Sequence, residues 1–247
     1  GSGHQIPPAH TAGEALFALC LKTLRHSPGA VPENWTSLYT RHKHYLADSL
    51  ARNGNPVAAY YTLQDALNTL EGYPYSQDIV KAYKQLGKKD AVARDKTLRS
   101  LLVTQEKELR SEYLKMLESK NKSWWLKQTE SLEIRINQAS GRRKLMLQRV
   151  RSFLSMVFFM KTRQAFQEDY YYVDKFLSIY QKIDPDNPDV FYFRARDFLE
   201  KGQTEKAAAA LRRAFALGFS DLHRLKIHPG LWALYQQKIQ HNGKPPA

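Results

Sequence analysis

Two amphipathic helical patterns separated by a short turn occupy residues 188–221 of this 247-residue chain. Ala195, Ala207 and Ala214 place small side chains where two adjacent helices cross, and Gly202 lies where the chain must reverse. A helical hairpin of this kind cannot bury its apolar face alone, so it requires similar hairpins on either side. The segment therefore predicts an array of stacked helical hairpins.

The same spacing of small residues recurs near the N-terminus. Ala47, Ala59 and Ala66 are separated by the same 12 and 7 residues as the three alanines of the first hairpin. Gly54 follows its first alanine by 7 residues, as Gly202 does. A period of 34 residues also predicts a degenerate unit at 154–187, and residues 74–104 predict a shortened unit marked by Ala82, Gly87 and Ala93.

The chain as a whole predicts an all-α fold, because no segment alternates apolar and polar residues as a strand does. We expect a tag remnant and flexible lead-in at 1–10, N-terminal repeats at 11–104, irregular long helices at 105–153, C-terminal repeats with a capping helix at 154–240, and a disordered tail at 241–247. Thr11 and Glu14 predict a capping box at the first helix, which we expect to stop near Ser27. Ser220 is the expected N-cap of a short helix, and Pro229 the start of the last one.

Composition restricts the classes of function. The net charge of +14 favours anionic partners, namely nucleic acid, acidic lipid, acidic protein or small anions. No apolar run is long enough to span a membrane. The single cysteine, Cys20, lies in an apolar run where we expect it to be buried, and it allows no internal disulfide. No nucleophile elbow, phosphate-binding loop or zinc-protease motif occurs, so we expect a protein that is not an enzyme.

The 34-residue period resembles that of tetratricopeptide repeats. The alanines fill the family's small positions, Leu63 and Leu211 its larger apolar position, and Pro185 its proline position in the degenerate unit. This resemblance implies helical hairpins stacked in a right-handed superhelix. The lysine and asparagine clamp of the chaperone-binding members is absent, which disfavours a chaperone co-factor.

The segment from Gly218 to Leu231 is similar to the terminal segment of tetratricopeptide proteins of the Bacteroides–Porphyromonas group. Many of those are exported, and they include the tetratricopeptide-like haemophores of Porphyromonas haem uptake. The resemblance implies haem or another porphyrin as ligand, an outer-membrane receptor or other protein as partner, and export after removal of a signal peptide.

The tetratricopeptide resemblance also implies which residues face a concave groove. In the last unit these are Asp189, Tyr192, Arg196 and Leu199, and in the degenerate unit Ser155, Phe158, Thr162 and Ala165. In the first unit they are Arg41, His44, Asp48 and Ala51.

Two further patterns bear on a ligand. Runs of adjacent aromatics, such as Tyr170 to Tyr172, cannot all face one core, so one ring of each run should lie at a surface where it could stack on a flat molecule. A basic run leads into an apolar stretch of helix, which is either a solvated face or an anion site beside an apolar groove. The candidate ligand-binding residues are Arg41, His44, Arg142, Arg143, Arg149, Phe158, Tyr171, Tyr172, Tyr192 and Arg196.

These observations favour capture of haem or a porphyrin in an aromatic and basic groove. A protein- or peptide-binding scaffold is the alternative, because that is the usual role of such repeats. A nucleic-acid-binding repeat is disfavoured, since equivalent positions of the units carry no regular polar pairs.

Overall fold

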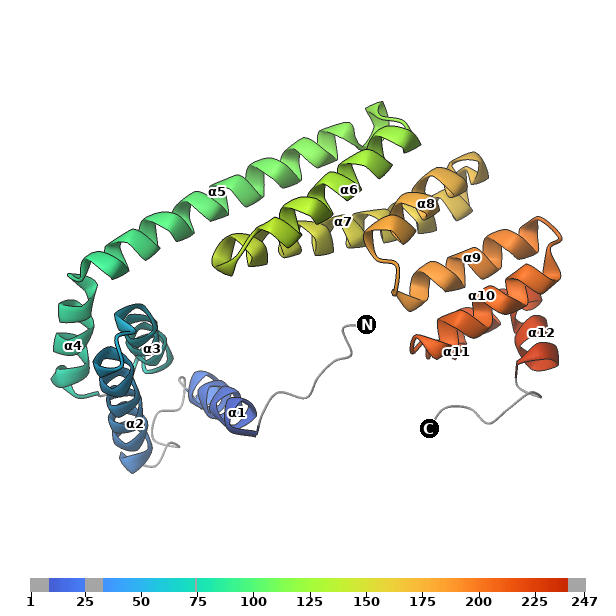
Figure 1. Cartoon of the computed structure of the whole chain (residues 1–247). Helices are drawn as coiled ribbons and strands as arrows, with labels where there is room; N and C mark the ends of the chain where they lie inside the picture. Colours follow the sequence, from blue (N-terminus) through green and yellow to red (C-terminus); the bar gives the residue numbers. More distant parts are fainter. Residues whose placement is uncertain (1–8, 25–32, 74, 240–247) are drawn as a thin grey trace. The chain divides into compact units, whose positions relative to one another are not determined.

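The computed structural model describes residues 9–24, 33–73 and 75–239 of the chain (Figure 1). The expected lead-in before residue 9, the end of the first helix near Ser27 and the expected tail at 241–247 lie outside these ranges. Within them the secondary structure is helical and contains no strand. The predicted all-α class is therefore confirmed. The chain divides into two compact units, of which the N-terminal one ends at Leu101 and the C-terminal one begins at Leu102.

The N-terminal unit contains α1 (Ala9–Leu24), α2 (Glu33–Arg52), α3 (Pro56–Thr69), α4 (Gln77–Gly87) and the first part of α5 (Asp90–Ser119). Helices α2 and α3 form the predicted hairpin, in which Ala47, Ala59 and Ala66 are buried. Gly54 has φ of +77°, which lets the chain reverse between them. The Asn55 side chain then accepts a hydrogen bond of 3.1 Å from the Ala58 backbone and caps α3.

Two expectations for α1 are wrong. The helix begins at Ala9, two residues before Thr11, so Thr11 lies inside the helix and does not cap it. Cys20 is exposed, because the face of α1 that packs on the core is the neighbouring one, which carries the buried Leu21. Leu16 and Leu19 are 62% and 59% exposed, so the apolar face of α1 is broader than the contact it makes within this unit.

Residues 74–104 do not form the expected shortened hairpin. Helix α4 packs against α3 and α2, whereas α5 continues for 30 residues without folding back along α4. Lys88, in the connection between α4 and α5, has a right-handed backbone conformation with φ of −83° and ψ of −9°. The connection lacks the left-handed glycine found at Gly54 and Gly202, and this explains why the chain does not reverse there.

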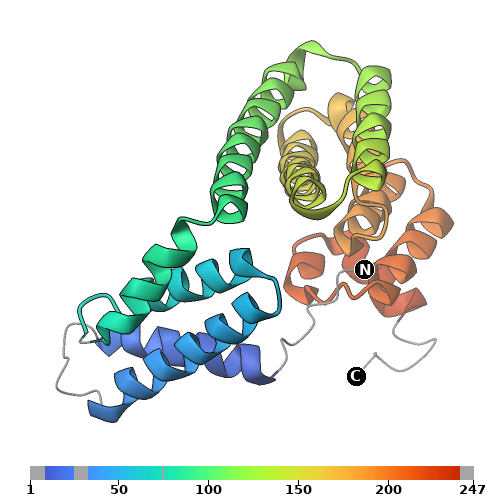
Figure 2. The same cartoon turned by 60° about the vertical axis from the view of Figure 1, so that its left-hand side comes forward.

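The C-terminal unit contains the rest of α5 and all later elements. These are α6 (Lys122–Gln138), α7 (Gly141–Glu168), a 3₁₀ turn (Tyr170–Tyr172), α8 (Val173–Ile183), α9 (Pro188–Glu200), α10 (Thr204–Ala216), α11 (Leu222–Lys226) and α12 (Pro229–Lys238). One core of buried side chains runs from Leu102 of α5 to Leu234 of α12. The boundary expected at 153 falls inside α7, so the long helices and the C-terminal repeats belong to the same unit. Figure 2 shows α7 packed beside α8.

The hairpin at 188–221 is confirmed as α9 and α10. Ala195, Ala207 and Ala214 are fully buried at the crossing, and Gly202 has φ of +70°. Asn187 caps α9 by accepting a hydrogen bond of 3.0 Å from the Asp189 backbone.

Two helices complete the end of the C-terminal unit. Helix α11 is capped by Asp221, not by Ser220 as expected, because the Asp221 carboxylate accepts a hydrogen bond of 2.9 Å from the Arg224 backbone. Helix α12 begins at Pro229 as predicted and packs on α9 and α10. Gly230 lies close to α9, since a Cβ there would be 2.7 Å from a terminal methyl of Leu199 and that side chain would have to move.

Candidate ligand-binding sites

Phe158 and Tyr192, two of the predicted ligand-binding residues, are core residues, and that expectation is corrected here. Phe158 is fully buried, and its ring lies 4.9 Å from that of Trp125 in α6. Thr162 and Ala165 on the same face of α7 are also buried. Helix α6 packs against both α7 and α8, so it covers the face that an open repeat would present to a ligand.

Tyr192 is covered by the end of the chain. The Phe219 ring stacks on the Tyr192 ring with 5.0 Å between their centres, and the Arg224 guanidinium lies 4.3 Å from the centre of the Tyr192 ring. The predicted neighbour Arg196 packs at 4.3 Å over Phe166 and contacts His228. Burial, together with Arg196, lowers the pKa of His228. The predicted groove of the last unit is therefore filled by the chain's own side chains.

The basic run at the start of α7 is partly neutralised by acidic residues of α5. Arg149 donates hydrogen bonds of 2.9 and 2.6 Å to the Glu106 carboxylate. Arg143 lines a small cavity of about 210 Å³ together with Glu108 and Glu112. Arg142 is half-buried. These arginines do not converge on the apolar second half of α7.

Arg41 and His44 do share a cavity. It measures about 580 Å³ and lies between α2 and the start of α4. Its walls are rich in hydroxyl groups, including those of Thr36, Ser37 and Thr40, while Tyr75 and Ile79 supply apolar surface. His44 also lines a smaller cavity with Asp48 and Ala51, as expected for this face of the first unit.

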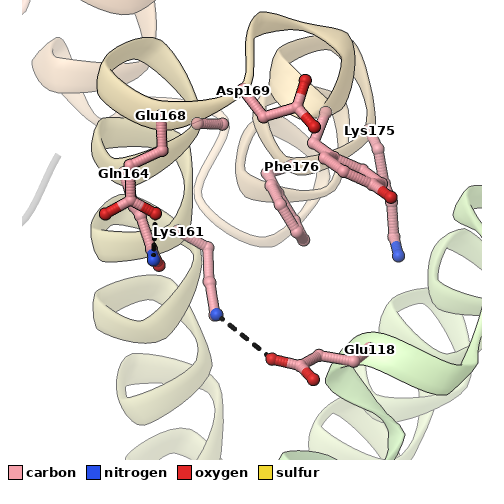
Figure 3. Close-up of a pocket in the computed structure, with 9 residues that line it drawn as sticks. Glu118, Lys161, Gln164, Glu168, Asp169, Lys175 and Phe176 are labelled. Atoms are coloured by element: carbon pink, nitrogen blue, oxygen red, sulfur yellow. Dashed lines mark hydrogen bonds and ion pairs between the residues drawn. The ribbon is translucent and has the colours of Figure 1, made fainter.

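The tyrosines that follow α7 are the exposed rings that the aromatic runs predicted. Tyr171 is 83% exposed, and Tyr172 is 43% exposed. Tyr172 lines a cavity of about 310 Å³ between the end of α7 and the start of α8 (Figure 3). Tyr170 is 41% exposed, and its hydroxyl donates a hydrogen bond of 2.8 Å to the buried Asp197 carboxylate.

One largely apolar cavity of the C-terminal unit was not predicted. It measures about 530 Å³ and is lined by α8, α9 and α10. Phe191 and Phe198 of α9 and Ala209 and Ala210 of α10 line it together with Gln181, Arg194, Lys206 and Arg213. We call this set of eight residues the cationic groove. Three of its residues are cations and none is acidic.

The groove has a local sequence signal. Phe191, Arg194 and Phe198 are spaced i, i+3 and i+7 on α9, and so they share one helix face. On α10, Lys206, Ala210 and Arg213 share a face in the same way. Each pattern is common on amphipathic helices, and only the packing of α9 on α10 combines them into one surface.

The three cations of the groove are held in different ways. Arg194 donates hydrogen bonds of 2.9 Å to Gln181 and 3.2 Å to Ser178, and burial lowers its pKa. Arg213 lies 5.7 Å from the centre of the Phe191 ring. Lys206 lies 5.9 Å from the centre of the Phe198 ring, so each phenylalanine of the groove has a cation beside it.

Arg213 also forms an ion pair of 3.7 Å with Asp186. Both side chains are about half exposed, at 53% and 56%, so the pair is a weak surface interaction that a ligand carboxylate could replace. Arg194 is 18% exposed, and it is held by its hydrogen bond to Gln181 and by an ion pair of 4.0 Å with Asp174, which fixes its position before any ligand arrives.

Further observations bear on the class of site. In the described ranges no three histidine, cysteine or acidic side chains lie close enough together to hold a metal ion. None of the helices described there has the length and apolar character that a membrane span requires. No family model matches the chain, and a search of curated proteins finds no significant relative.

Proposed function

We propose that the protein is a non-catalytic binding protein that holds haem or another porphyrin in the cationic groove. One observation carries this proposal: two phenylalanines and two alanines share one cavity lining with three cations and no carboxylate. A porphyrin combines a flat apolar body with two carboxylates, and charge-assisted hydrogen bonds from arginine suit such carboxylates well. The volume of about 530 Å³ lies within the range usual for small-molecule sites.

The proposed roles follow from the contacts in the groove. Phe191 and Phe198 would contact the face of the macrocycle. Arg194 and Arg213 would hold the carboxylates, with Lys206 as a third cation. The lining contains no histidine, tyrosine, cysteine or methionine, the usual protein ligands of haem iron. The groove would therefore bind the porphyrin by its periphery, and a metal-free porphyrin should bind as tightly as haem.

The resemblance to tetratricopeptide proteins supplies the rest of the proposal. It supports hairpins of the tetratricopeptide class stacked in a right-handed superhelix. It also supports export from the cytoplasm and a partner protein, such as an outer-membrane receptor, that takes over the ligand.

Titration with haemin and with metal-free protoporphyrin tests the proposal. We expect a shifted Soret band and similar affinities for both compounds. Phe191→Ala and Arg194→Met should each weaken binding about tenfold or more, because each removes a direct contact. Arg41→Met and His44→Ala in the N-terminal unit are the matched controls, and both should bind like the parent.

Two results would overturn this assignment. Absence of any Soret shift at micromolar porphyrin would exclude the ligand. Loss of binding in His44→Ala together with unchanged binding in Phe191→Ala would transfer the site to the N-terminal cavity, where a histidine could ligate iron.

Peptide binding is the second candidate function, and the cavity of Arg41 and His44 favours it. Its many hydroxyl groups suit the amides of an extended chain better than a porphyrin face. Partners recovered from the source cell by the parent protein, but not by an Arg41→Met, His44→Ala double variant, would support this function. Equal recovery by both proteins would count against it.

A further inference from the structure

The outer side of the N-terminal unit exposes large apolar side chains. On α2, Trp35, Leu38 and Tyr45 are spaced i, i+3 and i+10, so they share one helix face. Leu38 is 53% exposed and Tyr45 is 74% exposed, and Trp35 is exposed as well. The core-facing side of α2, in contrast, includes the buried polar residues Thr36 and Thr40. Large apolar side chains on the outside and polar ones on the inside of the same helix indicate an interaction surface.

Helix α1 extends this surface. The ring of Phe17 lies 5.4 Å from that of Trp35, so α1 lies beside the first half of α2. Leu16 and Leu19 lie on the face of α1 opposite the buried Leu21, and both are exposed. Because α1 and α2 bury their inner sides in one apolar cluster, their outer sides point away from it together. We define the outer apolar face as Leu16, Leu19, Trp35, Leu38 and Tyr45.

Cations accompany the outer apolar face. Arg41 is exposed and follows Leu38 by three residues on the same side of α2. Arg52, at the end of α2, forms an ion pair with Asp48 and so neutralises that carboxylate. The chain as a whole carries a net charge of +14. An anionic surface therefore suits this side of the unit.

The types of side chain favour a lipid surface. Tryptophan and tyrosine are enriched where a membrane meets water, because each combines an apolar ring with a polar group. Leucine side chains of a helix that lies in the plane of the membrane reach the acyl chains, while arginine on the same helix holds lipid phosphate. The outer apolar face and Arg41 supply all of these groups.

A second copy of the chain is the other occupant to consider. Each partner of a stable dimer buries about 800 Å², and the outer apolar face consists of only five partly exposed side chains. A symmetric dimer through this face would also bring Arg41 of both copies to the same interface. A bilayer requires no complementary shape, and its anionic headgroups attract the arginine.

We propose that the N-terminal unit binds the surface of an anionic phospholipid bilayer through the outer apolar face. The three leucines reach the acyl chains, the two aromatic rings lie at the level of the headgroups, and Arg41 holds a lipid phosphate. The proposal is independent of porphyrin binding, because the cationic groove belongs to the C-terminal unit.

Co-sedimentation of the whole protein with lipid vesicles tests this inference. We expect binding to vesicles made of equal parts of phosphatidylcholine and phosphatidylglycerol, and at least about tenfold weaker binding to phosphatidylcholine alone. Brominated lipid in the anionic vesicles should quench the fluorescence of Trp35, the one tryptophan of the N-terminal unit. Trp35→Phe should lose this quenching.

Variants locate the contact. The double variant Leu16→Ser, Leu38→Ser should bind anionic vesicles at least about tenfold more weakly, because it removes two exposed apolar side chains. The matched control is Leu145→Ser, Leu222→Ser, which replaces two exposed leucines of the C-terminal unit and should bind like the parent. Arg41→Gln should weaken binding to anionic vesicles about fivefold. Arg41 is exposed, so this variant folds even if the leucine variant does not.

Four results would each overturn the inference. The parent protein could bind neither kind of vesicle, or it could bind both kinds equally well. The two double leucine variants could bind anionic vesicles alike. Finally, sedimentation velocity could reveal a dimer that Leu16→Ser, Leu38→Ser abolishes, and the outer apolar face would then join two copies of the chain.

Discussion

Replacing Phe158 by alanine tests the assignment of this residue to the core. The side chain is fully buried, with its ring 4.9 Å from that of Trp125 and 6.3 Å from that of Phe176. Truncating a buried phenylalanine costs about 3–5 kcal/mol of unfolding free energy, from lost transfer energy and the cavity left behind. We expect the upper half of this range, because neighbours on three packed helices cannot collapse into the gap. Porphyrin affinity should not change, since Phe158 is outside the cationic groove.

Urea unfolding followed by tryptophan fluorescence measures this loss, because Trp125 contacts the altered ring. The matched control is Phe191→Ala. Phe191 is half-buried, so its truncation should cost only about 1 kcal/mol while weakening porphyrin binding. A Phe158→Ala protein that loses less than about 1 kcal/mol yet binds porphyrin poorly would refute our interpretation and restore Phe158 as a ligand contact.

Three further changes test the local structure. Gly202→Ala should lower the free energy of unfolding by about 1 kcal/mol in thermal unfolding, because φ at Gly202 is +70°, although the space around a Cβ is open. The control Gly13→Ala, inside α1, should raise the free energy of unfolding. Equal effects of the two substitutions would contradict this reasoning. Asn187→Ala should cost about 1 kcal/mol through loss of the α9 cap, whereas Asn187→Ser should retain most of it; Asn187→Asp would instead repel the Asp184 carboxylate, to which Asn187 donates a hydrogen bond of 2.9 Å. Burial and the hydrogen bond to Asp197 raise the pKa of Tyr170 above its ordinary value. The stability that Tyr170 contributes is therefore full below about pH 10 and is lost as the pH rises through the folded pKa. Tyr170→Phe should reduce this alkaline loss in unfolding curves measured between about pH 8 and 11, and an identical loss in both proteins would exclude Tyr170 as its source.

The helices themselves could be predicted from local patterns. The hairpin of α9 and α10 follows from alanines at the crossing and a glycine at the turn, and both signals lie within one short segment. The expected start of α12 at Pro229 agrees with the structure, because proline acts within the first helical turn. Ser220 was the wrong cap by one residue, since Ser220 and Asp221 can both cap a helix.

The candidate site could not be predicted in the same way. Phe158 and Tyr192 have the types and positions of ligand-binding residues, but whether a helix face is open depends on what packs against it. Helix α6 covers Phe158, and Phe219 covers Tyr192. Cys20 shows the opposite case: it lies in an apolar run of the sequence, yet its side chain is exposed in the N-terminal unit.

The sequence by itself determined that the chain is helical, that its last helix starts at Pro229, and that two hairpins reverse at left-handed glycines. These properties depend on interactions within a few residues of one another. Only the tertiary structure decided which faces are covered, that α5 does not fold back along α4, and that Phe191 and Phe198 lie beside Lys206 and Arg213. A binding surface formed by two or three helices depends on their packing, and packing is set by contacts among residues that are distant in the sequence.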